Sequence, residues 1–127
     1  MHKNENKKTE HLKQQIQELD LKIDAENDKL KHNNLIKEEM DNINASYNRC
    51  LQILARSARG KAANRKYNEL YTINKHQHIN TIDELDKQVQ ESKQKLDLYY
   101  SSRDSIEEEY EEEREKEQDK SKKETSN

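Results

Sequence analysis

The chain has 127 residues, of which 28% are hydrophobic and 40% are charged, and it contains no Pro, Trp or Phe. Globular domains are about 45–50% apolar, so this chain offers few core positions to offset an ordering cost of about 1–2 kcal/mol per residue. The composition therefore excludes an ordinary globular core built from one chain, and leaves either disorder or helices whose core is completed by partners. With one Gly and no Pro, the sequence favours long helices.

Cys50 is the single cysteine, which excludes an internal disulfide and is typical of a reducing compartment. No apolar run approaches the length of a membrane span, and residues 1–8 lack the apolar segment of a secretory signal. We therefore expect a protein of the nucleus or cytosol that does not contact a membrane. Its formal net charge of −3 is distributed unevenly. Residues 104–119 are strongly acidic, whereas no acid occurs between Asp41 and Glu69.

Residues 9–59 are expected to form a first coiled-coil arm, preceded by a disordered N-terminus at 1–8. Their apolar residues recur at alternating steps of four and three, which is typical of the a and d positions of a heptad repeat. Glu26 occupies a d position at which the apolar spacing is interrupted. The first series is Leu12, Ile16, Leu19, Ile23 and Leu30, and the second is Ile36, Met40, Ile43, Tyr47, Cys50 and Leu54.

The two series are out of register, because Leu30 and Met40 are ten residues apart instead of seven. This spacing predicts a three-residue skip within residues 31–35, which would overwind a coiled coil locally. A turn around Asn33 and Asn34 is the alternative. We favour the skip because no Gly or Pro is present to assist a reversal of the chain.

Residues 60–80 are expected to form a basic junction and a break between two arms. Gly60 costs about 1 kcal/mol relative to Ala inside a helix, so a bend or break is expected there. Residues 74–80 interrupt the apolar spacing with weak helix formers, and we expect a hairpin or a kink near them. Thr81 and Glu84 match a capping box, which predicts that a helix begins at Thr81.

Residues 81–118 are expected to form a second coiled-coil arm with an acidic end, followed by a disordered tail at 119–127. Apolar residues continue at steps of three and four, although Ser92 and Arg103 interrupt them. Polar residues at core positions lower stability and select partners, which favours a hetero-oligomer over a homodimer. The series is Ile82, Leu85, Val89, Ser92, Leu96, Tyr99, Arg103, Ile106 and Tyr110.

The predicted fold is all-α, an elongated coiled coil of two or three long helices with a break near 74–80 and disordered termini. Enzymatic activity is not expected, since a phosphate-binding loop needs several glycines. His76 and His78 would point away from each other on a helix, and no catalytic residue, cofactor or metal ligand set is expected. The residues expected to contact partner helices are Ala55, Ala58, Tyr67, Leu70, Ile82, Leu85, Val89 and Leu96.

The basic residues around Gly60 leave three interpretations open. They form a solvated or acid-paired helix face, contact the phosphates of RNA or DNA, or dock the chain onto a larger assembly. A basic-region zipper is excluded, because Gln77 and Glu84 occupy the heptad positions after Leu70. The basic residues concerned are Arg56, Arg59, Lys61, Arg65 and Lys66.

Around the junction the chain carries two arginines, an Asn-Arg pair, a Tyr, a Leu and an Ile, followed by a His-containing segment, a Thr and the second heptad series. These residues are Arg56, Arg59, Asn64, Arg65, Tyr67, Leu70, Ile73, His76, His78, Thr81 and Leu85. Their order resembles that of the THO complex subunit 7 family. The His-containing segment is shorter here, and it lacks the family's usual Pro.

The resemblance implies a nuclear, non-catalytic coiled-coil scaffold subunit that acts in transcription-coupled mRNA processing and export. It also implies pairing with other coiled-coil subunits, THO complex subunit 5 above all, and contact with RNA through the complex. Two other functions fit the residues. One is a helical nucleic-acid-binding protein that uses the basic junction, and the other is a cytoplasmic coiled-coil tether in a trafficking or kinetochore assembly.

Overall fold

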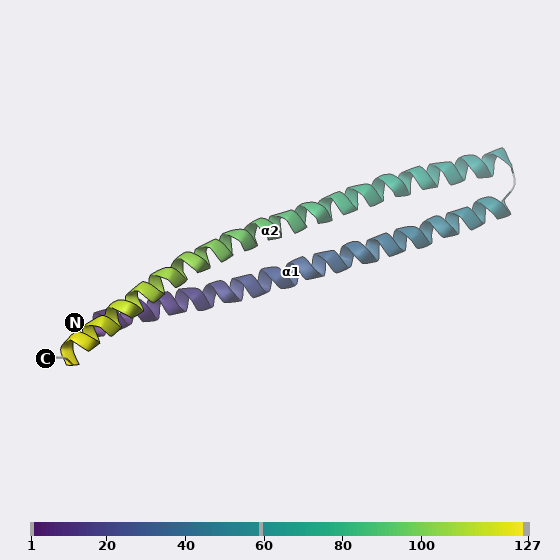
Figure 1. Ribbon diagram of the computed structural model, residues 1–127. Coiled ribbons are helices and arrows are strands. Elements are labelled where there is room, and N and C mark those ends of the chain that lie inside the picture. The colour runs from purple at the N-terminus through teal and green to yellow at the C-terminus, as the bar shows by residue number, and fades with distance from the viewer. Residues whose placement is uncertain (1, 59, 126–127) are drawn as a thin grey trace. The chain divides into compact units, whose positions relative to one another are not determined.

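Two long α-helices make up the computed structural model, which describes residues 2–58 and 60–125. Helix α1 spans His2–Ser57 and helix α2 spans Lys61–Thr125 (Figure 1). The prediction of an all-α fold is confirmed, with two helices in the described chain. Neither helix contains a Gly or Pro, which is the composition that long uninterrupted helices require.

The expected disordered termini are not confirmed. Helix α1 already includes residues 2–8, and helix α2 continues from residue 119 to Thr125. The acidic run of α2 remains helical because Glu and Lys are good helix formers even where no apolar side chain is available for packing.

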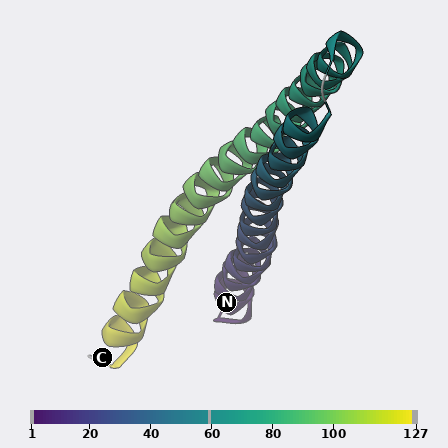
Figure 2. The same cartoon turned by 90° about the vertical axis from the view of Figure 1, so that its right-hand side faces the viewer.

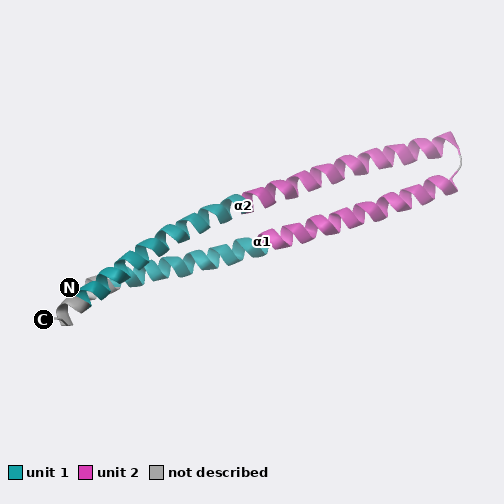
Figure 3. Ribbon diagram, viewed as in Figure 1, with its two compact units in different colours: residues 1–28, 93–127 teal, residues 29–92 magenta. Residues whose placement is uncertain are grey.

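The chain divides into two compact units, and each unit contains one segment of α1 and one segment of α2 (Figure 3). Unit 1 comprises residues 1–28 and 93–127, and unit 2 comprises residues 29–92. In unit 1, Lys8 contacts Glu113 and Asp20 contacts Arg103, so the two segments run antiparallel. Unit 2 is also antiparallel, since Lys37 contacts Asp86 and Asn44 contacts Asn74.

Unit 2 is a helical hairpin whose two segments are joined at residues 58–60 (Figures 1 and 2). The Ala58 N–H donates to the Leu54 carbonyl at 2.9 Å, and the Asn64 N–H donates to the Gly60 carbonyl at 3.1 Å. Gly60 has a φ of +126°, which L side chains rarely adopt. A Cβ at Gly60 would meet nothing within 4 Å, so the backbone conformation alone requires glycine. The break expected at Gly60 is therefore present.

The break predicted near 74–80 is wrong, because α2 continues without interruption through these residues. Thr81 does not begin a helix. Its hydroxyl donates to the Gln77 carbonyl at 2.9 Å, one turn earlier in the same helix. A capping-box sequence can therefore lie inside a helix when packing on both sides of it continues.

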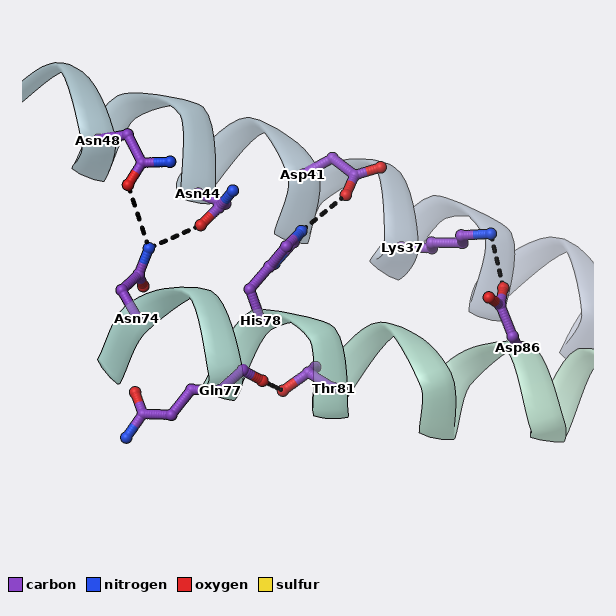
Figure 4. Close-up of polar contacts among 9 residues, drawn as sticks. All are labelled: Lys37, Asp41, Asn44, Asn48, Asn74, Gln77, His78, Thr81 and Asp86. Atoms are coloured by element: carbon purple, nitrogen blue, oxygen red, sulfur yellow. Dashed lines mark hydrogen bonds and ion pairs between the residues drawn. The ribbon is translucent and has the colours of Figure 1, made fainter. Parts of the chain in front are cut away.

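Hydrogen bonds between the helices explain why this segment stays helical (Figure 4). The Asn74 amide donates to Asn44 Oδ1 at 2.7 Å and to Asn48 Oδ1 at 3.3 Å. His78 Nε2 lies 3.1 Å from Asp41 Oδ1. The side chains that indicated a break thus find polar partners on α1, and these partners are distant in sequence.

The skip predicted within 31–35 is also wrong. Helix α1 continues through it in the first register, with Asn33 only 6% exposed and Lys37 half-buried. In the second series, by contrast, Ile43 and Leu54 are each 61% exposed. The Lys37 ammonium lies 2.6 Å from Asp86 Oδ1, so polar side chains maintain the register where apolar ones are missing.

The apolar series predicted for the second arm does coincide with the buried stripe of α2. Leu85, Val89 and Leu96 are buried, and Ser92 is the most buried of this series at 1% exposure. The other members of the series are half-buried: Ile82, Tyr99, Arg103, Ile106 and Tyr110. The interrupting residues therefore belong to the packing stripe, as their spacing indicates.

Candidate functional site

Two surface pockets lie between the helices of unit 2. One has a volume of about 180 Å³ and the other about 150 Å³. The pocket near the turn is lined by Leu51, Leu54, Ala55, Ala58, Ala63, Lys66, Tyr67 and Leu70. The pocket farther from the turn is lined by Met40, Ile43, Asn44, Asn74, Gln77, His78 and Thr81.

Both pockets open on the same side of the hairpin. Ile43 and Leu54, one from each pocket, are eleven residues apart on α1, which is about three helical turns. Lys66 and Gln77 are likewise eleven residues apart on α2. We call this side the lateral groove, and it consists of Met40, Ile43, Tyr47 and Leu54 from α1 and Lys66, Leu70, Ile73 and Gln77 from α2.

Exposed apolar residues lie on this side of the hairpin between the two pockets. Tyr47 follows Ile43 by one turn and precedes Leu54 by two turns. On α2, Ile73 follows Lys66 by two turns and precedes Gln77 by one turn. Both Tyr47 and Ile73 are exposed large hydrophobic residues. The groove is also almost free of formal charge, since Lys66 is the only Asp, Glu, Lys or Arg that lines either pocket, although 40% of the chain is charged.

The residues expected to contact partner helices divide between the stripe of α2 and the pocket near the turn. Leu85, Val89 and Leu96 are buried in the stripe of α2, and Ile82 is half-buried beside them. Four others, Ala55, Ala58, Tyr67 and Leu70, line the pocket near the turn. The rings of Tyr67 and Tyr71 stack with centroids 6.2 Å apart.

The basic residues gather around the turn of unit 2, and those that the structure describes are exposed. Arg56 lies in the last turn of α1, where a positive charge favours the helix dipole. Lys66 forms an ion pair of 3.6 Å with Glu69 on its own helix. Lys61 and Arg65 lie in the first turns of α2, and Arg59 lies outside the described residues.

In unit 1 the base Arg103 of α2 pairs with acids of both helices. Arg103 Nε lies 2.6 Å from Asp20 Oδ1, and Arg103 Nη1 lies 3.0 Å from Glu107 Oε2. These contacts, with the hydrogen bond to Asp20 as the largest cause, raise the pKa of Arg103 above its ordinary value. Arg103 is therefore held in the stripe by charge pairing, which its apolar neighbours could not provide.

No metal site or membrane span is found in the part of the chain that the structure describes. Its His, Cys, Asp and Glu side chains form no group of three or more that could hold a metal ion. Neither helix contains a described segment with the length and apolarity needed to cross a membrane. Cys50 is a free, exposed thiol.

The sequence reasoning missed several residues of the packing stripe of α1. Leu51 is buried at the turn end of unit 2, and Asn33, Asn44 and Asn48 occupy buried or half-buried positions. A signal for them was present, because Asn33 and Lys37 continue the four-and-three spacing of the first series. Apolar spacing alone does not reveal Asn33 or Lys37, and the second apolar series runs past Leu51 on a neighbouring face.

Comparison with protein-family models, with curated proteins and with solved structures finds no match to this chain. The resemblance to the THO complex subunit 7 family therefore has no independent support. What the chain does has to be argued from its residues and their geometry.

Proposed function

We propose that the chain is a non-catalytic scaffold subunit of a nuclear multiprotein complex, of the kind that the THO complex resemblance implies. The observation that supports this proposal is the exposed lateral groove of unit 2. A hairpin that served only its own two helices would need polar residues on that side. Instead, Ile43 and Leu54 remain exposed about three helical turns apart, beside the buried stripe. Two adjacent apolar stripes are typical of a helix with more than one helical neighbour.

We also propose that the paired segments in each unit supercoil as a coiled coil. The buried positions of α2 follow steps of three and four from Ile82 to Tyr110, which is the spacing that a left-handed supercoil keeps facing its partner. Such pairs are stiff, and stiffness suits a subunit that holds other proteins at fixed separation.

By the resemblance, the nearest partner would be THO complex subunit 5, and the complex would act in transcription-coupled mRNA processing and export. RNA contact would come through the complex. Other coiled-coil subunits of a nuclear assembly would serve the same scaffold role.

Affinity purification of the tagged chain from nuclear extract, with quantification of THO complex subunit 5 by mass spectrometry, tests this proposal. We expect near-stoichiometric recovery with the wild-type chain. A Leu85→Pro variant, which interrupts α2 inside its buried stripe, provides the negative control because proline breaks a helix interior. Absence of subunit 5 from the wild-type purification would remove the THO assignment.

A second candidate function is direct binding of nucleic acid at the turn of unit 2. It is favoured by the exposure of Arg56, Lys61 and Arg65, and by a first turn of α2 that contains no acidic residue. Phosphate contacts predict a steep loss of affinity with salt. RNA titrated against the purified chain should then bind at low salt, and should not bind when Arg56, Arg59 and Arg65 are changed to Glu. Binding that is absent or insensitive to salt excludes this function.

A further inference from the structure

We propose that the lateral groove of unit 2 binds the lateral groove of a second copy of this chain in antiparallel orientation, forming a four-helix bundle. The proposal rests on the same groove as the proposed scaffold function, and it makes a second copy of the chain the neighbour that this groove binds. In this arrangement the second heptad series of α1 packs against the second copy of the chain.

The groove has the apolar content of a helix–helix interface. Single exposed hydrophobic residues are normal on a protein surface, but those of the groove lie on one face at spacings of four and seven residues. Ile43 and Leu54 are exposed to the same extent as Ile53, which lies about 100° around the helix from Leu54 and faces away from α2. Ile53 has no Leu, Ile, Val, Met or aromatic residue three, four or seven positions away on α1, whereas Ile43, Tyr47 and Leu54 form a stripe.

The positions of the groove residues suit a two-fold axis. Ile43 and Leu54 lie at equal distances along α1 from a point between Asn48 and Arg49, and Lys66 and Gln77 lie at equal distances from a point between Tyr71 and Thr72 on α2. The contact between Asn48 and Asn74 places these two points at nearly the same level of the hairpin. An antiparallel partner would therefore set its Ile43 at the level of Leu54 and its far pocket opposite the near one. A self-complementary surface of this kind is what a two-fold dimer requires.

The charge pattern selects the antiparallel orientation. On the turn side of that level, residues 48–72 carry six bases and one acid, Glu69. On the other side, residues 38–47 and 73–84 together carry five acids and one base, Lys75. A parallel pair would place the six bases of each copy beside each other, whereas an antiparallel pair places them beside the acids of the partner. Exposed charges of this kind contribute little affinity, but they determine orientation.

The polar residues that favoured a hetero-oligomer in the sequence analysis pack or pair with residues of the same chain. Arg103 pairs with Asp20 within unit 1, and Ser92 is buried in the stripe of α2 within unit 2. Neither residue is available to discriminate between partners. Asn44, Asn74 and His78, which line the far pocket, already have polar partners within the hairpin.

Sedimentation equilibrium of the purified chain tests the proposal directly. The wild-type chain should approach twice its mass of 15.2 kDa as concentration rises. The double variant Ile43→Gln/Leu54→Gln should raise the dissociation constant by about 100-fold or more, because it removes two aliphatic side chains from the interface. Ile53→Gln is the matched control and should leave dimerisation unchanged. A wild-type chain that stays monomeric overturns the proposal and leaves the groove to a helix of another protein.

Cross-linking at Cys50 tests the position of the axis. Cys50 is exposed, lies one turn before Leu54, and is within two residues of the proposed two-fold level. A short bismaleimide should therefore link two wild-type copies. In a Cys50→Ser background, Gln52→Cys places the thiol on the far side of α1, and it should not be linked at the same protein concentration. Equal linkage of the two thiols would contradict the proposed interface.

Charge reversal tests the orientation. Glu39 lies one turn before Ile43 on the groove side of α1, and in the antiparallel pair its level along the bundle is within about one turn of the level of Lys66 in the second copy. Lys66→Glu should weaken the dimer, and Glu39→Lys in the same chain should restore it, at an unchanged net charge. A parallel pair would behave differently, because the Lys66→Glu chain would then bind the wild-type chain more tightly than a second copy of itself. Failure of restoration together with that preference would reject the antiparallel arrangement.

Discussion

At the scale of single residues, three buried polar atoms find no hydrogen-bond partner within the described structure: Glu26 Oε1, Asn33 Nδ2 and Ser92 Oγ. Each belongs to a position where an apolar side chain would pack. An unsatisfied buried polar group costs about 1–3 kcal/mol. Such residues lower the stability of a helix pair, but they also disfavour other registers. The chain therefore keeps one alignment of its helices at the expense of stability.

Asn33→Leu should stabilise unit 2 by about 1–3 kcal/mol, because it removes an unsatisfied amide and adds apolar packing. Urea unfolding followed by circular dichroism measures this change. Asn44→Leu is the matched control, since Asn44 already accepts a hydrogen bond from Asn74 and its loss should give no such increase. If both variants changed the free energy of unfolding equally, the missing hydrogen-bond partner of the Asn33 amide would not explain the gain.

Glu113 links stability to pH. The Lys8 ammonium, 3.1 Å from Glu113 Oε1, is the main cause that lowers the pKa of Glu113 below its ordinary value of 4.5. A carboxylate with a lowered pKa stabilises the fold above that ordinary value, and the contribution is lost as the pH falls through the folded-state pKa. Carbon-detected NMR titration should show the pKa of Glu113 rising in Lys8→Met and staying unchanged in Lys7→Met. A pKa that is the same in both variants would contradict this role of Lys8.

At the scale of helices, α2 was easier to predict from sequence than α1. The stripe of α2 from Ile82 to Tyr110 is largely apolar, so its spacing identifies it. In α1 the stripe beyond Leu30 passes through Asn33 and Lys37, while apolar residues continue on a neighbouring face. Periodicity of apolar residues alone then follows the wrong face. The continuity of α2 at 74–80 could not be predicted either, because it depends on partners from α1.

The buried stripe of α2 should carry the stability of unit 2. Leu85→Ala should destabilise the fold by about 2 kcal/mol or more, since it leaves a cavity in a buried position. Leu98→Ala, at an exposed position of the same helix, should change stability by less than about 0.5 kcal/mol. Chemical unfolding of both variants checks this difference. Similar losses in the two would show that Leu85 does not pack against α1.

At the scale of the whole molecule, the sequence could not distinguish a helix partner in the same chain from one in another chain. Heptad spacing is the same in both cases, and the scarcity of apolar residues favoured an external partner. The structure pairs α1 with α2 within each unit. It leaves the lateral groove of unit 2 without a neighbour among the described residues. Leu70 belongs both to this groove and to the predicted contact residues, so the expectation of partners stays a prediction.

Thermal unfolding should depend on protein concentration if two copies associate through the groove. Because only the folded dimer buries the groove, the midpoint of unfolding should rise as the concentration of the chain is increased. The Ile43→Gln/Leu54→Gln variant should lose this dependence, while Ile53→Gln should keep it. Scanning calorimetry over a wide concentration range measures the effect. A midpoint independent of concentration in the wild-type chain would argue for a monomer.

The antiparallel pairing of unit 2 also limits which changes of length the chain can tolerate. Contacts run nearly in step along the hairpin, from Asn48 with Asn74 to Lys37 with Asp86. Removing one residue from either helix would rotate every later side chain by about 100° and take its stripe out of contact. Removing seven residues from both helices at the same level would preserve the contacts. Insertions and deletions in this hairpin should therefore survive only as matched pairs of whole heptads.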